Sequence, residues 1–177
     1  MPAFADPQDT AFYPIHFLFA RIVGSWTGFA IAAFVLASCF MYAYVYSLTR
    51  SRPAAAFAGL IFGLSETMME RFAHMTVLHA IAWLPLMLLA IDRLRGQRPN
   101  RWIAIGAFAI GCCILGGHPQ VVLYLMYTCG LYALAGGIVE RAGWIYYARI
   151  AAALALGIGL TAVKTIPLAE TSALTAR

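Results

Sequence analysis

Two long apolar runs, residues 102–115 and 121–139, are separated only by the five residues GGHPQ at positions 116–120. Glycine allows a helix to end, and proline suits the first turn of a helix because its missing N–H has no partner there. The sequence therefore predicts two helices joined by a tight turn, with His118 and Gln120 at its tip.

The composition places this hairpin in a membrane. Hydrophobic residues make up 63% of the 177-residue chain, charged residues only 11%, and the mean hydropathy is +0.80. A soluble domain is typically about half apolar and a quarter charged. We therefore expect an all-α polytopic membrane protein whose GGHPQ turn lies at a bilayer face.

A bilayer span needs about 20 mostly apolar residues, so the chain has room for about six spans in a single transmembrane domain over residues 1–177. Residues 1–24 are expected to form an outer loop and an interfacial helix. Residues 54–69 either cross as a short helix or re-enter the same face, and Pro85 is expected to kink its span. The expected spans are approximately residues 26–48, 54–69, 78–94, 102–116, 119–139 and 149–167.

The basic residues predict the orientation. If successive spans alternate, the loops at 49–53, 92–101 and 140–149 share one side, and the positive-inside rule makes that side cytoplasmic. The same rule explains the formal net charge of +5 without a nucleic-acid partner. The four histidines then lie on the extracytoplasmic side: His16, His74, His79 and His118.

The cysteines do not indicate a metal site or a disulfide. All four lie inside apolar runs, without the spacing of a zinc site or of paired loop disulfides. The frequent glycines of the expected spans, such as Gly106, Gly111, Gly130, Gly157 and Gly159, are typical of close helix packing in membranes.

The extracytoplasmic side holds the first candidate site residues, His118 and Gln120. An imidazole and an amide there can contact a phosphate or a sugar hydroxyl, or they can simply meet headgroup water at helix ends.

A second group is Glu66, Glu70, His74 and His79. The spacing of four residues would place Glu66, Glu70 and His74 on one side of a helix. That helix is either part of a substrate site or an amphipathic helix at the membrane surface.

Two further candidates lie near the chain ends. Asp6 and Asp9 can hold Mg²⁺ or Mn²⁺, which use one or two carboxylates plus substrate phosphate, or they are solvated turn residues. Lys164 can balance the charge of a lipid-linked phosphate, or its side chain can extend to the headgroups.

Four segments resemble the YfhO family of bacterial polytopic membrane proteins, in the GT-C superfamily of glycosyltransferases. They are DPQDTAFYP at 6–14, HAIAWLPLMLLAIDRL at 79–94, ILGGHPQVVLY at 114–124 and AVKTIPLAE at 162–170. The resemblance implies a GT-C-like bundle in the bacterial inner membrane. It also implies transfer of a sugar from a polyprenyl-phosphate donor to an extracytoplasmic envelope glycan or lipid.

In that resemblance Asp6 and Tyr13 match the end of the first outer loop, which would supply catalytic acids and metal ligands. Lys164 departs from the family, which has glutamine there. Family members begin with a further transmembrane helix, so this chain resembles a fragment or a minimal member.

We therefore expect Asp6 and Asp9 to act as catalytic residues and metal ligands. The remaining candidates would bind substrate: Tyr13, Glu66, Glu70, His74, His79, His118, Gln120 and Lys164. The alternative is a non-catalytic membrane subunit that binds lipid or packs within a larger complex. A haem or metal membrane protein using the outer histidines is a third reading.

Overall fold

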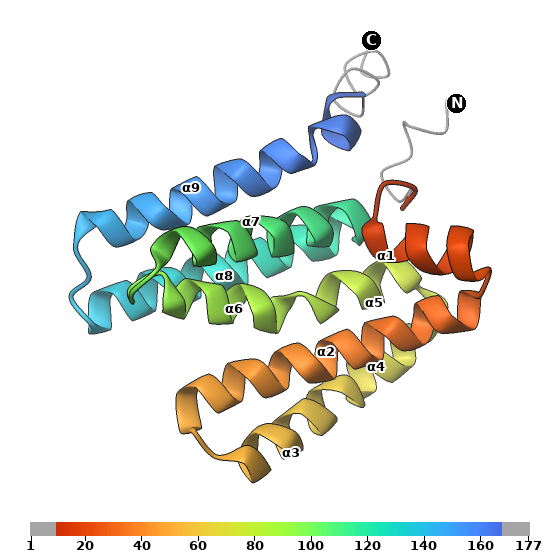
Figure 1. Ribbon diagram of the computed structural model, residues 1–177, viewed down its shortest axis with the longest axis horizontal. Helices are drawn as coiled ribbons and strands as arrows, with labels where there is room; N and C mark the ends of the chain where they lie inside the picture. Colours follow the sequence, from red (N-terminus) through yellow and green to blue (C-terminus); the bar gives the residue numbers. More distant parts are fainter. Residues whose placement is uncertain (1–9, 168–177) are drawn as a thin grey trace.

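The structure is a computed structural model that describes residues 10–167; Asp6 and Asp9 lie outside the described residues. Within that range the chain forms helices and connecting turns and no strand, so the expectation of an all-α fold is confirmed (Figure 1). The chain enters the bundle through α1 (Pro14–His16) and a π-helical segment, η2 (Phe17–Val23), which ends at Gly24.

Serine caps open the first two long helices. α2 (Trp26–Thr49) begins after Ser25, whose Oγ accepts from the backbone N–H of Gly28 at 2.9 Å. α3 (Arg52–Gly63) begins after Ser51, with Pro53 in its first turn. Such caps satisfy N–H groups that have no partner inside the helix.

The region expected to span at 54–69 is broken. α3 ends at Gly63, and the chain continues as two short pieces, α4 (Glu66–Glu70) and η3 (Arg71–Ala73). At about 1.5 Å per residue the 12 residues of α3 cover about 18 Å, well short of a hydrocarbon core of about 30 Å.

Proline breaks the next helix. α5 (Met75–Ala82) and α6 (Leu84–Arg93) follow one another with a turn at Trp83. Pro85 lies in the first turn of α6, where its missing N–H needs no partner. The interruption therefore falls two residues before the proline that causes it.

The last three helices are α7 (Pro99–Gly116), α8 (Pro119–Val139) and α9 (Trp144–Leu160), after which residues 162–167 are again helical. Four stretches of the described chain are long and apolar enough to cross a membrane: Trp26–Thr49, Met75–Arg93, Pro99–Gly116 and Pro119–Val139. α9 is apolar but shorter, at 17 residues. The protein therefore has the character of a membrane-embedded helical bundle.

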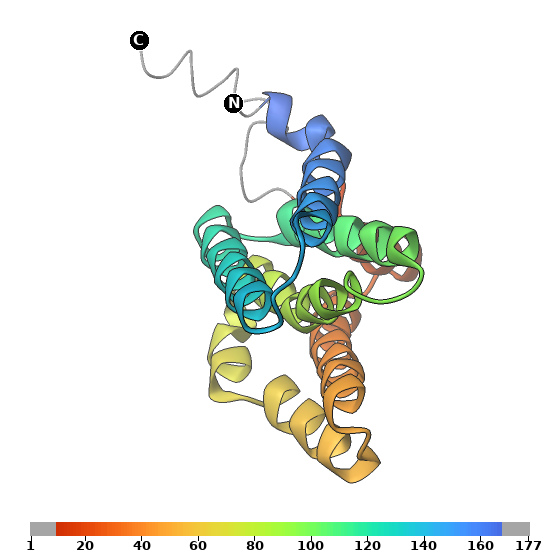
Figure 2. The same ribbon diagram turned by 90° about the vertical axis from the view of Figure 1, so that its left-hand side faces the viewer.

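Small residues set the packing of the outer helices. α9 lies against α7 on one flank of the bundle, and α3 lies against α2 on the opposite flank (Figure 2). A Cβ added at Gly157 would come within 2.7 Å of Ile110 and 3.0 Å of the Ala107 carbonyl oxygen. By contrast, a Cβ at Gly130 or Gly159 would meet nothing within 4 Å. The expectation of close approach at glycines therefore holds for some of the glycines only.

The helices run alternately, and this gives the bundle two chemically different ends (Figure 1). The loops between α2 and α3, α6 and α7, and α8 and α9 meet at one end. We call it the arginine end, because those loops and the adjoining turns hold Arg50, Arg52, Arg93, Arg95, Arg98, Arg101, Arg141 and Arg149.

The opposite end holds α1, η2, α4, the start of α5 and the turn between α7 and α8. We call it the histidine end, because His16, His74, His79 and His118 lie in or beside these elements.

Candidate functional site

A buried aromatic cluster ties the start of the described chain into the histidine end. The Trp83 Nε1–H donates to the Tyr13 hydroxyl oxygen at 2.9 Å, and that hydroxyl lies 3.0 Å from His79 Nδ1. His79 Nε2 lies 3.1 Å from the carbonyl oxygen of Phe29, and its ring stacks on the Phe29 ring with centroids 4.0 Å apart.

The bonding pattern assigns the proton positions. A carbonyl only accepts, so His79 Nε2 carries the proton and Nδ1 accepts from the Tyr13 O–H. One neutral imidazole tautomer thus satisfies every polar atom of the cluster. Burial raises the pKa of Tyr13, so its hydroxyl stays protonated. Tyr13 and His79 are both fully buried, and their polar atoms bond to the protein itself.

Close packing explains why the first two residues of the GGHPQ turn are glycines. α7 ends at Gly116, and Gly117 is extended, with φ −101°, so neither uses a left-handed conformation. A Cβ on Gly116 would come within 2.9 Å of the Tyr13 ring, and one on Gly117 would collide with the Cys113 carbonyl oxygen. The close approach of the chain to Tyr13 therefore requires glycine here.

His118 and Gln120 lie at the tip of the hairpin, as the sequence predicts. His118 caps the start of α8, and its Nδ1 is buried with no hydrogen-bond partner in the described structure. Gln120 is exposed and donates from Nε2 to the Tyr124 hydroxyl at 2.8 Å.

Lys164 is buried, with 6% of its surface exposed. Its Nζ donates to the carbonyl oxygens of Ile114 at 3.3 Å and Leu115 at 3.1 Å, both in the last turn of α7. A cation at this position satisfies carbonyls that have no partner within the helix and offsets the negative end of its dipole.

Lys164 also lines a groove of about 270 Å³ between the end of α7, the start of α8 and residues 162–167. Apart from Lys164 and Thr165, the groove is walled by apolar side chains and backbone. Its lining residues are Ile114, Gly117, Pro119, Val122, Leu123, Met126, Lys164 and Thr165. An apolar wall is chemically suited to a lipid chain, and the ammonium group of Lys164 is bonded to the end of α7 beside it.

The structure does not bring Glu66, Glu70 and His74 onto one helix face. All three are exposed, but α4 ends at Glu70 and His74 follows a separate 3₁₀ turn. The spacing of four residues therefore acts within a helix for Glu66 and Glu70, both in α4, but not for His74. Across residues 10–167 no three His, Cys, Asp or Glu side chains gather as metal ligands.

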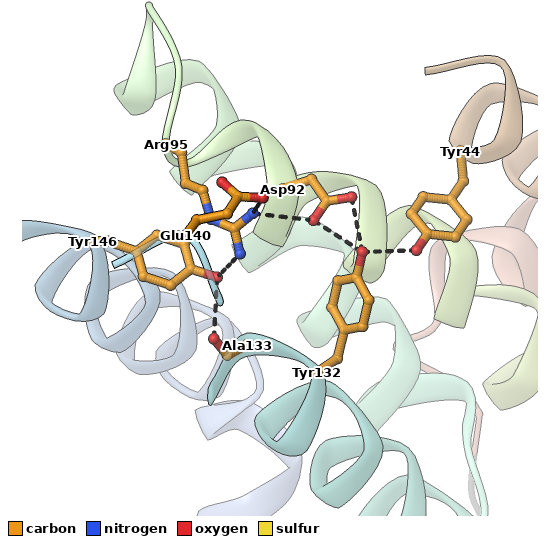
Figure 3. Close-up of polar contacts among 7 residues, drawn as sticks. All are labelled: Tyr44, Asp92, Arg95, Tyr132, Ala133, Glu140 and Tyr146. Carbon is orange, nitrogen blue, oxygen red and sulfur yellow. Dashed lines mark hydrogen bonds and ion pairs between the residues drawn. The ribbon is translucent and has the colours of Figure 1, made fainter. Parts of the chain in front are cut away.

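A second polar cluster, at the arginine end, was not predicted from the sequence (Figure 3). The Arg95 guanidinium lies over the ring of Tyr146 and donates to the Tyr146 hydroxyl at 3.2 Å. It also donates to Glu140 Oε1 at 2.7 Å and forms a longer ion pair with Asp92 Oδ1, at 3.9 Å. A Cβ on Gly136 would collide with the guanidinium, so the glycine makes room for it.

Two tyrosines extend this cluster to α2. The Tyr44 hydroxyl donates to the Tyr132 oxygen at 2.8 Å, and the Tyr132 hydroxyl donates to the Asp92 carboxylate at 2.9 and 3.0 Å (Figure 3). The Asp92–Arg95 spacing of three residues was the available signal. In the sequence both residues fall in the loop expected at 92–101, where charged residues are common and do not indicate a cluster.

Comparison of the chain with protein-family models, curated proteins and solved structures gave no match.

Proposed function

We propose that the protein is a GT-C-type glycosyltransferase, similar to the YfhO family, that uses a polyprenyl-phosphate sugar. The observation that carries this proposal is the groove beside Lys164. Its apolar wall suits an isoprenoid chain, and the ammonium group supplies a point charge for a phosphate. The resemblance of four sequence segments to the YfhO family suggests the type of reaction, which is sugar transfer.

In this proposal the groove holds the donor lipid, and the adjacent tip of the hairpin contacts its phosphate or sugar. His118 is suited to that contact because its buried Nδ1 lacks a partner in the described structure. Gln120 and the exposed Glu66, Glu70 and His74 are available for sugar hydroxyls at the same end of the bundle. The acceptor would be a cell-envelope glycan or lipid.

Tyr13 and His79 take a different role. Their polar atoms already bond within the aromatic cluster, so they hold the start of the described chain against α2 and α5 instead of contacting the substrate. Asp6 and Asp9 supply the general base and the ligands of Mg²⁺ or Mn²⁺. By the positive-inside rule the site faces the extracytoplasmic side of the bacterial inner membrane.

The first test is selective binding. We expect the detergent-solubilised protein to bind a polyprenyl phosphate at least tenfold more tightly than the matching polyprenyl alcohol, measured by the shift in unfolding temperature. Lys164→Met should remove this preference, and Lys164→Arg should keep it because a cation remains. Equal affinity of the wild type for the phosphate and the alcohol would refute the donor site.

The second test is transfer. With a polyprenyl-phosphate sugar, an envelope acceptor and Mg²⁺ or Mn²⁺, the wild type should form a glycosylated product. Asp6→Asn and Asp9→Asn should abolish product formation while leaving binding of the polyprenyl phosphate unchanged, because the acids act on the reaction and not on the groove.

A second candidate function is that of a non-catalytic membrane subunit that binds lipid or packs within a larger complex. It is favoured by the polar atoms of Lys164, Tyr13 and His79, which bond to the protein's own chain. Phosphate-selective binding without transfer by the wild type, together with purification in a stoichiometric assembly, would establish this function instead.

A further inference from the structure

Three arginines at the arginine end share an unusual backbone conformation. Within residues 10–167 the non-glycine residues with positive φ are Arg50 at 57°, Arg98 at 63° and Arg141 at 51°. Arg50 follows α2, Arg98 precedes α7, and Arg141 comes shortly after α8. Each of the three loops at this end therefore contains one left-handed arginine.

The backbone alone does not explain why these residues are arginines. The left-handed region is strained for a residue with a Cβ, and glycine or asparagine is the usual choice there. A backbone outlier that recurs once in each of three loops at the same end is a reason to look for a role of the side chain.

The fold does not use these side chains. Arg50, Arg98 and Arg141 are exposed, and no side-chain hydrogen bond, ion pair or ring contact within the described chain involves them. Other arginines at the same end differ. Arg95 pairs with Glu140, and Arg149 donates to the Leu94 carbonyl oxygen at 2.7 Å.

Tryptophans lie beside two of the three loops, those between α6 and α7 and between α8 and α9. Trp102 lies in the first turn of α7 with the guanidinium groups of Arg93 and Arg101 5.9 and 5.8 Å from its ring. Trp144 is the first residue of α9 and is 78% exposed. Tryptophan beside arginine at helix ends is typical of the membrane–water interface.

The charge of this end is strongly positive. Its eight arginines face only two carboxylates, Asp92 and Glu140, both of which lie beside Arg95. The surplus of positive charge is therefore carried by the arginines outside that cluster, including the three strained ones.

We infer that Arg50, Arg98 and Arg141 bind the phosphate groups of anionic phospholipids in the leaflet at the arginine end. A guanidinium presents paired N–H donors that match phosphate oxygens, and it is less strongly hydrated than an ammonium. Placing one in each loop gives the bundle three separate contacts around its rim. This role is independent of the proposed glycosyltransferase site, which lies at the other end.

The experiment is a lipid titration of the full chain in a neutral detergent, with the unfolding temperature as the readout. Phosphatidylglycerol should stabilise the wild type at a lower concentration than phosphatidylcholine. Salt at about 0.5 M screens exposed charges and should reduce this difference between the two lipids. We expect each arginine to contribute about fivefold to the preference for the anionic lipid. The variant Arg50→Gly/Arg98→Gly/Arg141→Gly should therefore require at least tenfold more phosphatidylglycerol.

Glycine is chosen because it removes the charge and relieves the backbone together. Without lipid the triple glycine variant should unfold at the same temperature as the wild type or higher. The corresponding triple lysine variant keeps the charge and should keep much of the lipid preference. Arg71→Gly removes an exposed arginine from the histidine end and should leave the preference unchanged.

Two results would overturn the inference. One is an unchanged phosphatidylglycerol response in the triple glycine variant, and the other is a wild type that responds equally to both lipids. If the triple variant does not fold, the three single glycine variants give the same test, each with an expected loss of about fivefold.

Discussion

The Tyr13 hydroxyl joins parts of the chain that are 66 and 70 residues apart, through His79 and Trp83. It accepts one hydrogen bond and donates another, so removing it leaves two buried groups without a partner. A buried polar group without a hydrogen-bond partner costs more folding free energy than an average hydrogen bond contributes.

Tyr13→Phe should therefore lower the free energy of unfolding by about 1–3 kcal/mol, measured by denaturant titration in micelles. The matched control is Tyr124→Phe, because the Tyr124 hydroxyl is exposed and bonds only to the exposed Gln120 in the described structure. Tyr124→Phe should change the free energy of unfolding by no more than about 0.5 kcal/mol. Equal losses in the two variants would mean that the aromatic cluster does not stabilise the fold.

At the scale of the helices, short-range signals placed some starts and one of the two interruptions. The proline of the GGHPQ turn marks a helix start in the sequence and in the structure, where α8 begins at Pro119. Pro85 predicted the interruption of its span, and the helix is broken at Trp83, two residues before that proline. The division of residues 54–69 was less visible, because no proline marks it and local apolarity continues to Leu64. Packing against other helices decides a break of that kind, and a hydropathy pattern does not record that packing.

Helix packing predicts opposite effects for two glycines of α9. Gly157→Ala should destabilise the protein by about 1–3 kcal/mol, because the new methyl group would press on Ile110 and the Ala107 carbonyl oxygen. Gly159→Ala meets open space and should stabilise it by about 0.4–1 kcal/mol through the higher helix propensity of alanine. Both changes in the free energy of unfolding are measured in the same detergent. Stabilisation by Gly157→Ala would contradict the observed contact of α7 with α9.

On the scale of the whole molecule, the arginine end is held together by side chains from four helices and the loops that follow them. Asp92 and Arg95 come from the end of α6, Tyr132 from α8, Tyr44 from α2 and Tyr146 from α9 (Figure 3). At the histidine end Tyr13 and Lys164 bind the two ends of the described chain to α5, α6 and α7.

Within the arginine-end cluster the two ionic contacts should differ in strength. Arg95→Gln should lower the free energy of unfolding by about 1–3 kcal/mol, because it leaves Asp92 and the Tyr146 hydroxyl without their shared cation. Glu140→Gln should change it by less than about 0.5 kcal/mol, because the Glu140 side chain is 57% exposed and solvent screens the pair. A larger loss for Glu140→Gln would show that the exposed pair dominates.

The sequence by itself determined the class of the protein, the helix starts at Trp26 and Pro119, and the separation of arginines from histidines. These follow from local composition and from alternation along the chain, which need no knowledge of distant contacts. It also placed His118 and Gln120 at the tip of a hairpin.

Only the tertiary structure decided which side chains meet. It placed His79 and Tyr13 in a closed buried cluster, put Lys164 at the end of α7 beside a groove, and joined Arg95 to Tyr146 of α9 and to Glu140 after α8. It also showed that the glycines of the GGHPQ turn provide space and not a left-handed turn. Contacts between residues 40 to 70 positions apart depend on how helices cross, and that geometry is absent from any local pattern in the chain.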